Sequence, residues 1–511
     1  MENFRTGARL LETLTSALYA DPIIVFREYV QNAVDSFRRS DNSTEHVVDI
    51  TINIDKKIVM IEDNGSGITV DKFESTMRNI SRSDKDGDDS QIGFRGIGRL
   101  AGLAFCEKLW FINRKDKSSP QYFFWNCARY REILNSRNGA KDLDDVIGEI
   151  ANPSDSCDIL RELKSNSEST FIVILQDVKQ ELIDCITESN SKNKKATTIA
   201  EDYSNTFRHA LELLLPLPYA ESFEKKQLIQ ERFKEVFGYE LSKNQFNVKL
   251  NGDPLFKPFS YDEKKDFQMI PIEIFPVDSS GTPSDEPQTI GLLWMTFDYV
   301  FKAAKDYWGI AVRSKNMLVR GKSVLAEEAF ASQNAITTYN QYLAAIKGVS
   351  GELFLETTCL KDNSRRDWFN VDYNSLQLRT QLCALMNKMH IYRYKMSRFI
   401  HNDNRTEADK EDVIKAYSDF TSRQDPSPVS NFLDARIAAD DERETDPRAD
   451  ERDIVGYSMP QKRFYREIMM QIYEYFEDKE KIDYYKLKSF IVKKLNRESE
   501  NEPFSSEDRN A

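Results

Sequence analysis

Apolar residues recur at helical spacing near the start of the chain, just after an Asp21-Pro22 pair that is typical of a helix N-terminus. These apolar positions are Ile23, Phe26, Val30, Val34 and Phe37. Apolar and polar residues then alternate over 48–54, which predicts a strand, and a turn at 55–57 leads into a second strand at 58–61. The pattern therefore predicts one helix followed by two neighbouring strands.

The central part of the chain mixes both periodicities. An apolar run at 100–105 predicts a buried helix, and strands are expected at 108–112 and 170–175. Residues near 225–375 predict a second α/β unit, with strands at 246–250, 272–275, 290–297, 310–319 and 352–355. Helical spacing then returns over 376–400, so a long helix is expected to follow this unit.

The composition changes after residue 400. Residues 401–460 hold 16 Asp and Glu against 8 Lys and Arg, with prolines that include Pro426, Pro428 and Pro447 and few apolar residues, which predicts a solvated, disordered linker. Helical periodicity resumes over 461–495. We therefore expect a first domain at 1–220, a second at 221–375, a helix at 376–400, the linker at 401–460, and a short helical module with a tail at 461–511.

Length and charge restrict the classes of protein that remain. The 511 residues leave room for about three domains. A formal net charge of −13 disfavours general coating of nucleic acid and binding to an anionic membrane, although a local basic groove stays compatible with it. The six cysteines are scattered, and no stretch approaches the roughly 18 apolar residues of a membrane span. We expect free thiols and a cytoplasmic protein that does not use a membrane.

Three polar residues share one face of the first predicted helix at spacings of four and three. They are Glu28, Asn32 and Asp35. Such a stripe is compatible with a binding site and equally with the solvated face of an amphipathic helix. The helix taken alone leaves both interpretations open.

Two glycine-rich stretches follow this helix. Asp63 ends the second strand and precedes Gly65 and Gly67, a loop in which a backbone can approach a flat ligand or simply turn. Gly93, Gly96 and Gly98 precede the apolar run, an arrangement that can wrap phosphates or form an ordinary turn. The second stretch is not of the Walker type, because no Gly-Lys-Ser/Thr follows.

In this order and spacing the stretches resemble the GHKL superfamily, which includes type II topoisomerases, the heat-shock protein 90 family, histidine kinases, MutL and MORC proteins. The segments that carry the resemblance are EYVQNAVDS at 28–36, EDNGSGI at 62–68, IGFRGIGRLAG at 92–102 and Ser169-Thr170. They fall between about residue 20 and residue 175. The resemblance implies an α+β chain whose first domain is a Bergerat sandwich that binds ATP.

The resemblance also implies a role for each matching residue. Asn32 would hold Mg²⁺ and Glu28 would activate the attacking water, with Asp35 supporting the helix and a water near the nucleotide. Asp63 would accept the adenine amino group and Thr170 would contact adenine through water. The remaining positions implied in nucleotide binding are Gly65, Gly67, Gly93, Gly96, Ile97 and Gly98, and residues 81–91 would form a lid.

The second unit resembles the middle segment of the heat-shock protein 90 family. The stretches that carry this likeness are GIAVRSKNMLVRGKS at 309–323 and LKDNSRRDWF at 360–369. The likeness implies a transducer domain in which Arg365 or Arg366 reaches the γ-phosphate as a catalytic arginine.

These features lead us to expect a Mg²⁺-dependent ATPase that works as a conformational clamp of the heat-shock protein 90 type, forms a nucleotide-dependent homodimer and acts on a protein client. A DNA-associated clamp like MORC or MutL, with defence against foreign DNA as one role, stays open as the alternative, and so does a nucleotide-gated scaffold with little turnover. A histidine kinase is disfavoured, because the chain has four histidines and only 27 residues precede Glu28.

Overall fold

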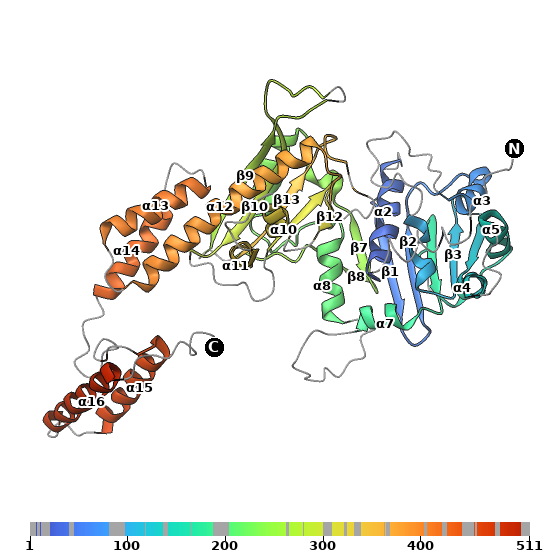
Figure 1. Ribbon diagram of the computed structural model, residues 1–511. Coiled ribbons are helices and arrows are strands. Elements are labelled where there is room, and N and C mark those ends of the chain that lie inside the picture. Colours follow the sequence, from blue (N-terminus) through green and yellow to red (C-terminus); the bar gives the residue numbers. More distant parts are fainter. Residues whose placement is uncertain are drawn as a thin grey trace. The chain divides into compact units, whose positions relative to one another are not determined.

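The computed structural model describes 7, 11, 21–39, 45–80, 98–117, 119–135, 142–163, 165–187, 204–261, 265–278, 281–299, 309–320, 324–331, 339–361, 363, 368–402, 406–421, 427–441, 454, 457–475 and 481–501. It divides into two units, residues 1–423 and 424–511. The first unit holds both sheets, and the second is helical (Figure 1). The mixed α+β class is confirmed.

The first sheet has eight strands in the order β5-β4-β3-β6-β2-β1-β7-β8. All neighbours are antiparallel except β1 and β7, which are parallel with Val48 opposite Val248. The strands are β1 (Val47–Asn53), β2 (Ile58–Asp63), β3 (Lys108–Asn113), β4 (Gln121–Asn126), β5 (Ala151–Ser154), β6 (Phe171–Gln176), β7 (Asn247–Leu250) and β8 (Asp253–Pro254).

Alternation along the strands separates the two faces of this sheet. Val59 and Ile61 of β2 belong to the large core beneath the helices, whereas Ile58 and Met60 join a smaller cluster on the other face. Asp63 therefore projects to the helix-covered side. The helices and 3₁₀ segment of this region are α2 (Ile24–Arg38), α3 (Val70–Arg78), η2 (Gly98–Ala104), α4 (Cys127–Asn135), α5 (Leu143–Ile150), α6 (Asp158–Glu162), α7 (Gln180–Thr187) and α8 (Asn205–Leu214).

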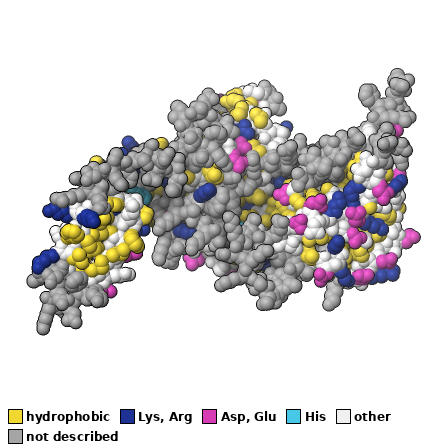
Figure 2. Space-filling model, turned by 60° about the horizontal axis from the view of Figure 1, so that its bottom comes forward, with side chains coloured by type: hydrophobic (Ala, Val, Ile, Leu, Met, Phe, Trp, Pro, Cys, Tyr) yellow, Lys and Arg dark blue, Asp and Glu magenta, His cyan; other side chains and the backbone are white. Residues whose placement is uncertain are grey.

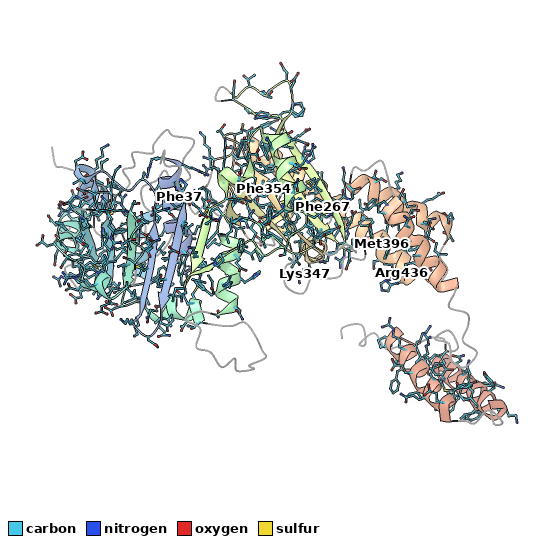
Figure 3. The ribbon with its side chains drawn as sticks, turned by 180° about the vertical axis from the view of Figure 1, so that it is seen from behind. Phe37, Phe267, Lys347, Phe354, Met396 and Arg436 are labelled. Atoms are coloured by element: carbon cyan, nitrogen blue, oxygen red, sulfur yellow. The ribbon has the colours of Figure 1, made fainter. Side chains whose placement is uncertain are left out.

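The second sheet has five strands in the order β12-β11-β13-β10-β9. An aromatic cluster fills one side of it and includes Trp294, Phe267 and Phe354, the last two labelled in Figure 3. The elements are α9 (Lys226–Phe237), η3 (Leu241–Asn244), β9 (Asp266–Ile274), β10 (Gln288–Phe297), β11 (Gly309–Ser314), β12 (Met317–Arg320), α10 (Val324–Ala331), α11 (Tyr339–Lys347), β13 (Val349–Leu355), α12 (Tyr373–His401) and α13 (Glu407–Thr421).

The second unit contains α14 (Ser427–Asp441), α15 (Met459–Tyr475) and α16 (Lys481–Asn501). Helices α15 and α16 pack around the buried side chains of Tyr465, Met469 and Tyr484. The Tyr484 hydroxyl donates to the Met469 carbonyl at 3.1 Å. The predicted helical module is confirmed. None of the described helices is long and apolar enough to cross a membrane.

Several predicted elements are also confirmed in the first unit. The first helix, the hairpin β1–β2, the strands β3 and β6, and the long helix α12 all lie where the periodicity placed them. Helix α12 begins with a capping box, in which Asp372 accepts from the Ser375 amide at 2.8 Å. The six cysteines are free, as expected.

The apolar run after Gly98 forms a buried helix, as predicted, and this helix is of the 3₁₀ type. Three predictions about local structure are wrong. The strand expected at 310–319 is the hairpin β11–β12, because Lys315 and Asn316 adopt positive φ and reverse the chain. Strand β7, expected in the second domain, pairs with β1 of the first sheet, so the boundary at residue 220 does not separate the sheets.

The third wrong prediction is the disordered linker expected at 401–460. Helices α13 and α14 occupy 407–421 and 427–441 within it. Helix α13 buries Val413, Tyr417 and Phe420, and the Tyr417 hydroxyl donates to the buried Asp266 carboxylate of β9. The few apolar residues of α13 lie on one face and pack against the second sheet. The acidic composition of 401–460 was therefore misleading as a sign of disorder.

Candidate active site

A cavity of about 740 Å³ lies between α2, the loop after β2, α3 and the start of η2, over the helix-covered face of β2, β3 and β6. Five residues that the sequence singled out line it together: Glu28, Asn32, Asp63, Gly67 and Gly98. They come from three segments separated by up to 70 positions in the chain. Their convergence favours a binding site over three unrelated turns and faces.

Helix α2 supplies the first wall. It forms because its apolar residues pack into the core, and it begins with the Ile24 amide donating to the Asp21 carbonyl at 3.1 Å. Glu28 is only 5% exposed and Asp35 is fully buried, so the solvated-face interpretation of this stripe is wrong. Glu28 and Asn32 line the cavity, whereas Asp35 does not.

Asp63 ends β2 and is 7% exposed. Burial raises the pKa of its carboxyl group to about 7, although the Gly65 amide, which donates to Oδ1 at 2.9 Å, and the nearby Arg39 both act to lower it. One such bond leaves the carboxylate able to accept further donors from a ligand in the cavity.

The loop after Asp63 is held by contacts that require its two glycines. A Cβ on Gly65 would lie 2.3 Å from the Ser36 hydroxyl oxygen of α2, and Gly67 adopts a φ of +61°. Thr170 does not line the cavity but fastens the loop, because its hydroxyl donates to the Gly65 carbonyl at 2.8 Å and its amide to the Asp63 carbonyl at 2.7 Å.

Asn113 and Tyr29 are positioning residues that sequence reasoning missed. Asn113 is buried at the end of β3, donates to the Ile68 carbonyl at 2.7 Å and accepts from the Ile68 amide at 3.2 Å. Tyr29 donates to the Arg99 carbonyl at 3.1 Å and accepts from the Gly102 amide at 2.9 Å. A lone Asn after the apolar run of β3 was the one local signal; Tyr29 reads as an ordinary core residue.

Gly98 brings the third segment against α2. A Cβ at this position would lie 2.3 Å from Glu28 Oε2, so a larger residue would displace the carboxylate. The other predicted members of this stretch, Gly93, Gly96 and Ile97, and the predicted lid at 81–91 lie outside the described residues. Arg365 and Arg366 lie outside them as well.

Four cations line the cavity together with the carboxylates of Glu28 and Asp63. Three of them, Arg39, Lys72 and Lys115, are exposed, and the fourth, Arg99, is more buried. Over the rest of this part of the molecule Lys and Arg are mixed with Asp and Glu on the face in Figure 2. The cavity can therefore receive a ligand that carries both hydrogen-bond donors and negative charge, in a chain whose net charge is negative.

Helix α2 also reaches the second sheet. Arg38, near its end, donates to Asn244 Oδ1 at 2.7 Å, and the Asn244 amide donates to the Tyr239 hydroxyl at 3.3 Å. Tyr239 in turn donates to Glu356 Oε2 at 2.7 Å, just after β13. Burial raises the pKa of Glu356 to about 7. Nearby, Phe37, labelled in Figure 3, stacks on Phe246.

An α/β sandwich with such a cavity between a polar helix and two glycine loops defines a class of nucleotide-binding domain. Residues 22–144 match the family described as histidine kinase-, DNA gyrase B- and HSP90-like ATPase. The chain thus carries a GHKL ATPase domain, as the sequence motifs predicted.

Curated relatives of this chain include bacterial proteins named chaperone protein HtpG. The chain is 25% identical to that of Chlorobium chlorochromatii over 143 residues, which are 24% of this chain and 23% of the chaperone. For Bacteroides thetaiotaomicron the figures are 25% over 138 residues, 24% and 20%; for Halalkalibacterium halodurans they are 26% over 181 residues, 31% and 27%. The match thus spans about a quarter of the length of these chaperones.

Proposed function

We propose that this protein is a Mg²⁺-dependent ATPase whose hydrolysis drives a conformational clamp of the heat-shock protein 90 type. The observation that carries the proposal is the position of Glu28, a buried carboxylate that lines the cavity and lies against Gly98 of the second glycine stretch. A carboxylate held there can orient a water and accept its proton during attack on the terminal phosphate.

The remaining residues of the site would each bind one part of the nucleotide or hold the loops around it. Asp63 would accept the adenine amino group at the floor of the cavity, and Thr170 and Asn113 would hold the loops that shape this end. Gly65 and Gly67 keep the backbone close enough for the base to enter. Gly98, with Gly93, Gly96 and Ile97, would present backbone amides to the phosphates.

The cavity suits Mg²⁺ only as a partner of the nucleotide. The described residues contain no group of three His, Cys, Asp or Glu able to hold a metal ion. Asn32 lines the cavity one helical turn from Glu28 and offers a neutral amide oxygen, a ligand type that Mg²⁺ accepts. With this one protein ligand, the ion would take its other oxygens from phosphates and water, where it neutralises phosphate charge.

The clamp part of the proposal rests on the Arg38, Asn244, Tyr239 and Glu356 contacts, which join the helix of the site to the second sheet. A shift of α2 on hydrolysis would therefore be transmitted to that sheet through these contacts. We further propose a nucleotide-dependent homodimer and a protein client, in line with the chaperones named above. Arg365 or Arg366 stays the proposed transducer arginine.

A DNA-associated clamp is the second candidate, and one feature favours it. On α16, Lys486, Phe490, Lys493 and Lys494 are exposed and share one face of the helix. Phe490 is 67% exposed among these lysines, a combination that suits phosphates and unstacked bases. Stimulation of hydrolysis by duplex DNA at low salt would favour this candidate over the chaperone-like one.

The test is steady-state ATP hydrolysis by the full chain with and without Mg²⁺. Glu28→Gln should bind ATP like the wild type and lose about 10² to 10⁴ in turnover, because it cannot accept the proton. Glu62→Gln is the matched control: Glu62 is also buried, but it lies on the opposite face of β2 and accepts from the Asn166 amide at 3.0 Å. Equal turnover in the two variants would refute the role of Glu28.

A further inference from the structure

Arg99 stands out among the cavity residues because its charge is poorly compensated. Its Nε and Nη2 atoms are buried and have no hydrogen-bond partner among the residues that the structure describes. The backbone at this position is fixed, since the Arg99 carbonyl accepts from the Tyr29 hydroxyl. The side chain belongs to the cavity wall, one residue beyond Gly98.

Buried guanidinium nitrogens without an acceptor are costly, because their hydrogen bonds to water have been lost without replacement. Burial lowers the pKa of Arg99 to about 10, so the group still carries its charge near neutral pH. By comparison, the fully buried Arg313 donates to two carbonyl groups through Nη1, to a third through Nη2, and to the Glu352 carboxylate through Nε. Two buried nitrogens of Arg99 thus lack, among the described residues, the kind of partners that Arg313 has.

We propose that Arg99 is a phosphate-binding residue of this site, supplied by the ATPase domain itself. The inference rests on the proposed function, since it takes the ligand to be an adenine nucleotide. A phosphate group brings the negative charge and the acceptor oxygens that this guanidinium lacks, and its geometry suits a two-pronged contact. The three exposed cations of the cavity are better solvated and gain less from such a contact.

The location of Arg99 specifies which part of the nucleotide it would contact. It follows Gly98, whose backbone lies against Glu28, whereas Asp63 lies on another segment at the floor of the cavity. Arg99 should therefore contribute to the binding of phosphates and not to the binding of the base. This separation makes the proposal testable by comparing ligands that share adenosine and differ in phosphate number.

The experiment is calorimetric titration of the full chain with ATP, ADP and adenosine in Mg²⁺ buffer. Arg99→Met should lower ATP and ADP affinity about tenfold to a hundredfold, the range for a lost charged hydrogen bond, and leave adenosine affinity within about twofold. Arg99→Lys keeps the charge but not the planar set of guanidinium donors, so its ATP and ADP affinities should lie between those of the wild type and Arg99→Met. The control is Arg129→Met, whose side chain pairs with Glu132 and Glu149 outside the cavity.

Two results would overturn the proposal. ATP affinity that is unchanged in Arg99→Met would show that phosphates do not contact the residue, and an equal loss for ATP and adenosine would show a structural role, such as pairing with a carboxylate of segment 81–97. If Arg99→Met unfolds, the ATP-to-adenosine affinity ratio of Arg99→Lys decides. Binding needs no turnover, so wild-type protein that binds ATP without hydrolysing it would contradict the proposed function and leave this inference standing.

Discussion

The cavity and the second sheet both bury charged side chains, but they differ in whether these charges have counter-charges and hydrogen-bond partners. At the second sheet, Arg313 and Glu352 of its strands and Lys257 of the segment before β9 have fully buried side chains, and Lys257 Nζ lies 2.9 Å from Glu352 Oε1. The Tyr219 hydroxyl and the Trp294 indole also donate to Glu352. In the cavity, by contrast, two buried nitrogens of Arg99 have no hydrogen-bond partner within the part of the chain that the structure describes.

The pKa values follow this difference. Burial alone would raise the pKa of Glu352, but Lys257 and Arg313 hold it below its usual range. Burial raises the pKa of Asp63 to about 7 because the Gly65 amide and Arg39 offset little of the desolvation. A buried charge with a counter-charge supports the fold, whereas a buried charge without one can still bind a ligand group.

The largest effect is expected where the charges are paired. Glu352→Gln leaves two buried cations without a counter-charge and should lower the free energy of unfolding by about 3–5 kcal/mol, measured by urea denaturation. The control is Glu168→Gln, which breaks the exposed pair with Lys117 at 2.9 Å and should cost about 1 kcal/mol or less. Equal losses in the two variants would mean that the buried network contributes no more than a surface pair.

An intermediate effect is expected from pH at Asp63. Its raised pKa means that a proton must leave before the carboxylate can accept from adenine, so adenosine affinity should rise by up to about tenfold per pH unit below pH 7 and level off above it. The same shift makes the folded state more stable below the unfolded pKa of about 4, a contribution lost as pH rises to about 7.

Adenosine suits this titration because it carries no phosphate that changes charge in the range. Calorimetry between pH 5.5 and 8 gives the profile, and Asp63→Asn should bind more weakly with no such slope. A flat profile for the wild type would show that the carboxylate is not the group that adenine contacts.

The last effect concerns the contact between the two regions and is expected to be smaller than that of Glu352→Gln. Arg38→Met removes the charged bond to Asn244 and should cost about 1.5–3 kcal/mol in unfolding free energy. Because Arg38 lies away from the cavity, adenosine affinity should stay within about twofold while turnover changes. If affinity and turnover both match the wild type, this contact does not couple the site to the second sheet.

Much of the local structure was predictable because short-range periodicity decides it. The alternation at 48–54 and the capping box of α12 each act within a few residues, so β1 and α12 appear where expected. The pairing of β7 with β1 joins positions about 200 apart, and α13 depends on burial against β9. Local patterns do not encode such partners.

For the site, the residue types in the motifs predicted Glu28, Asn32, Asp63 and the glycines, because few residue types suit the binding of phosphate and adenine. The sequence by itself thus determined the class of domain and the candidate ligand. The tertiary structure decided which of these side chains face one cavity and that Asp35 and Thr170 do not line it. It also decided that two nitrogens of Arg99 are buried without a hydrogen-bond partner in the described part of the chain. Burial, and with it the pKa of Asp63 and the unmet hydrogen bonds of Arg99, exists only once distant segments have packed together.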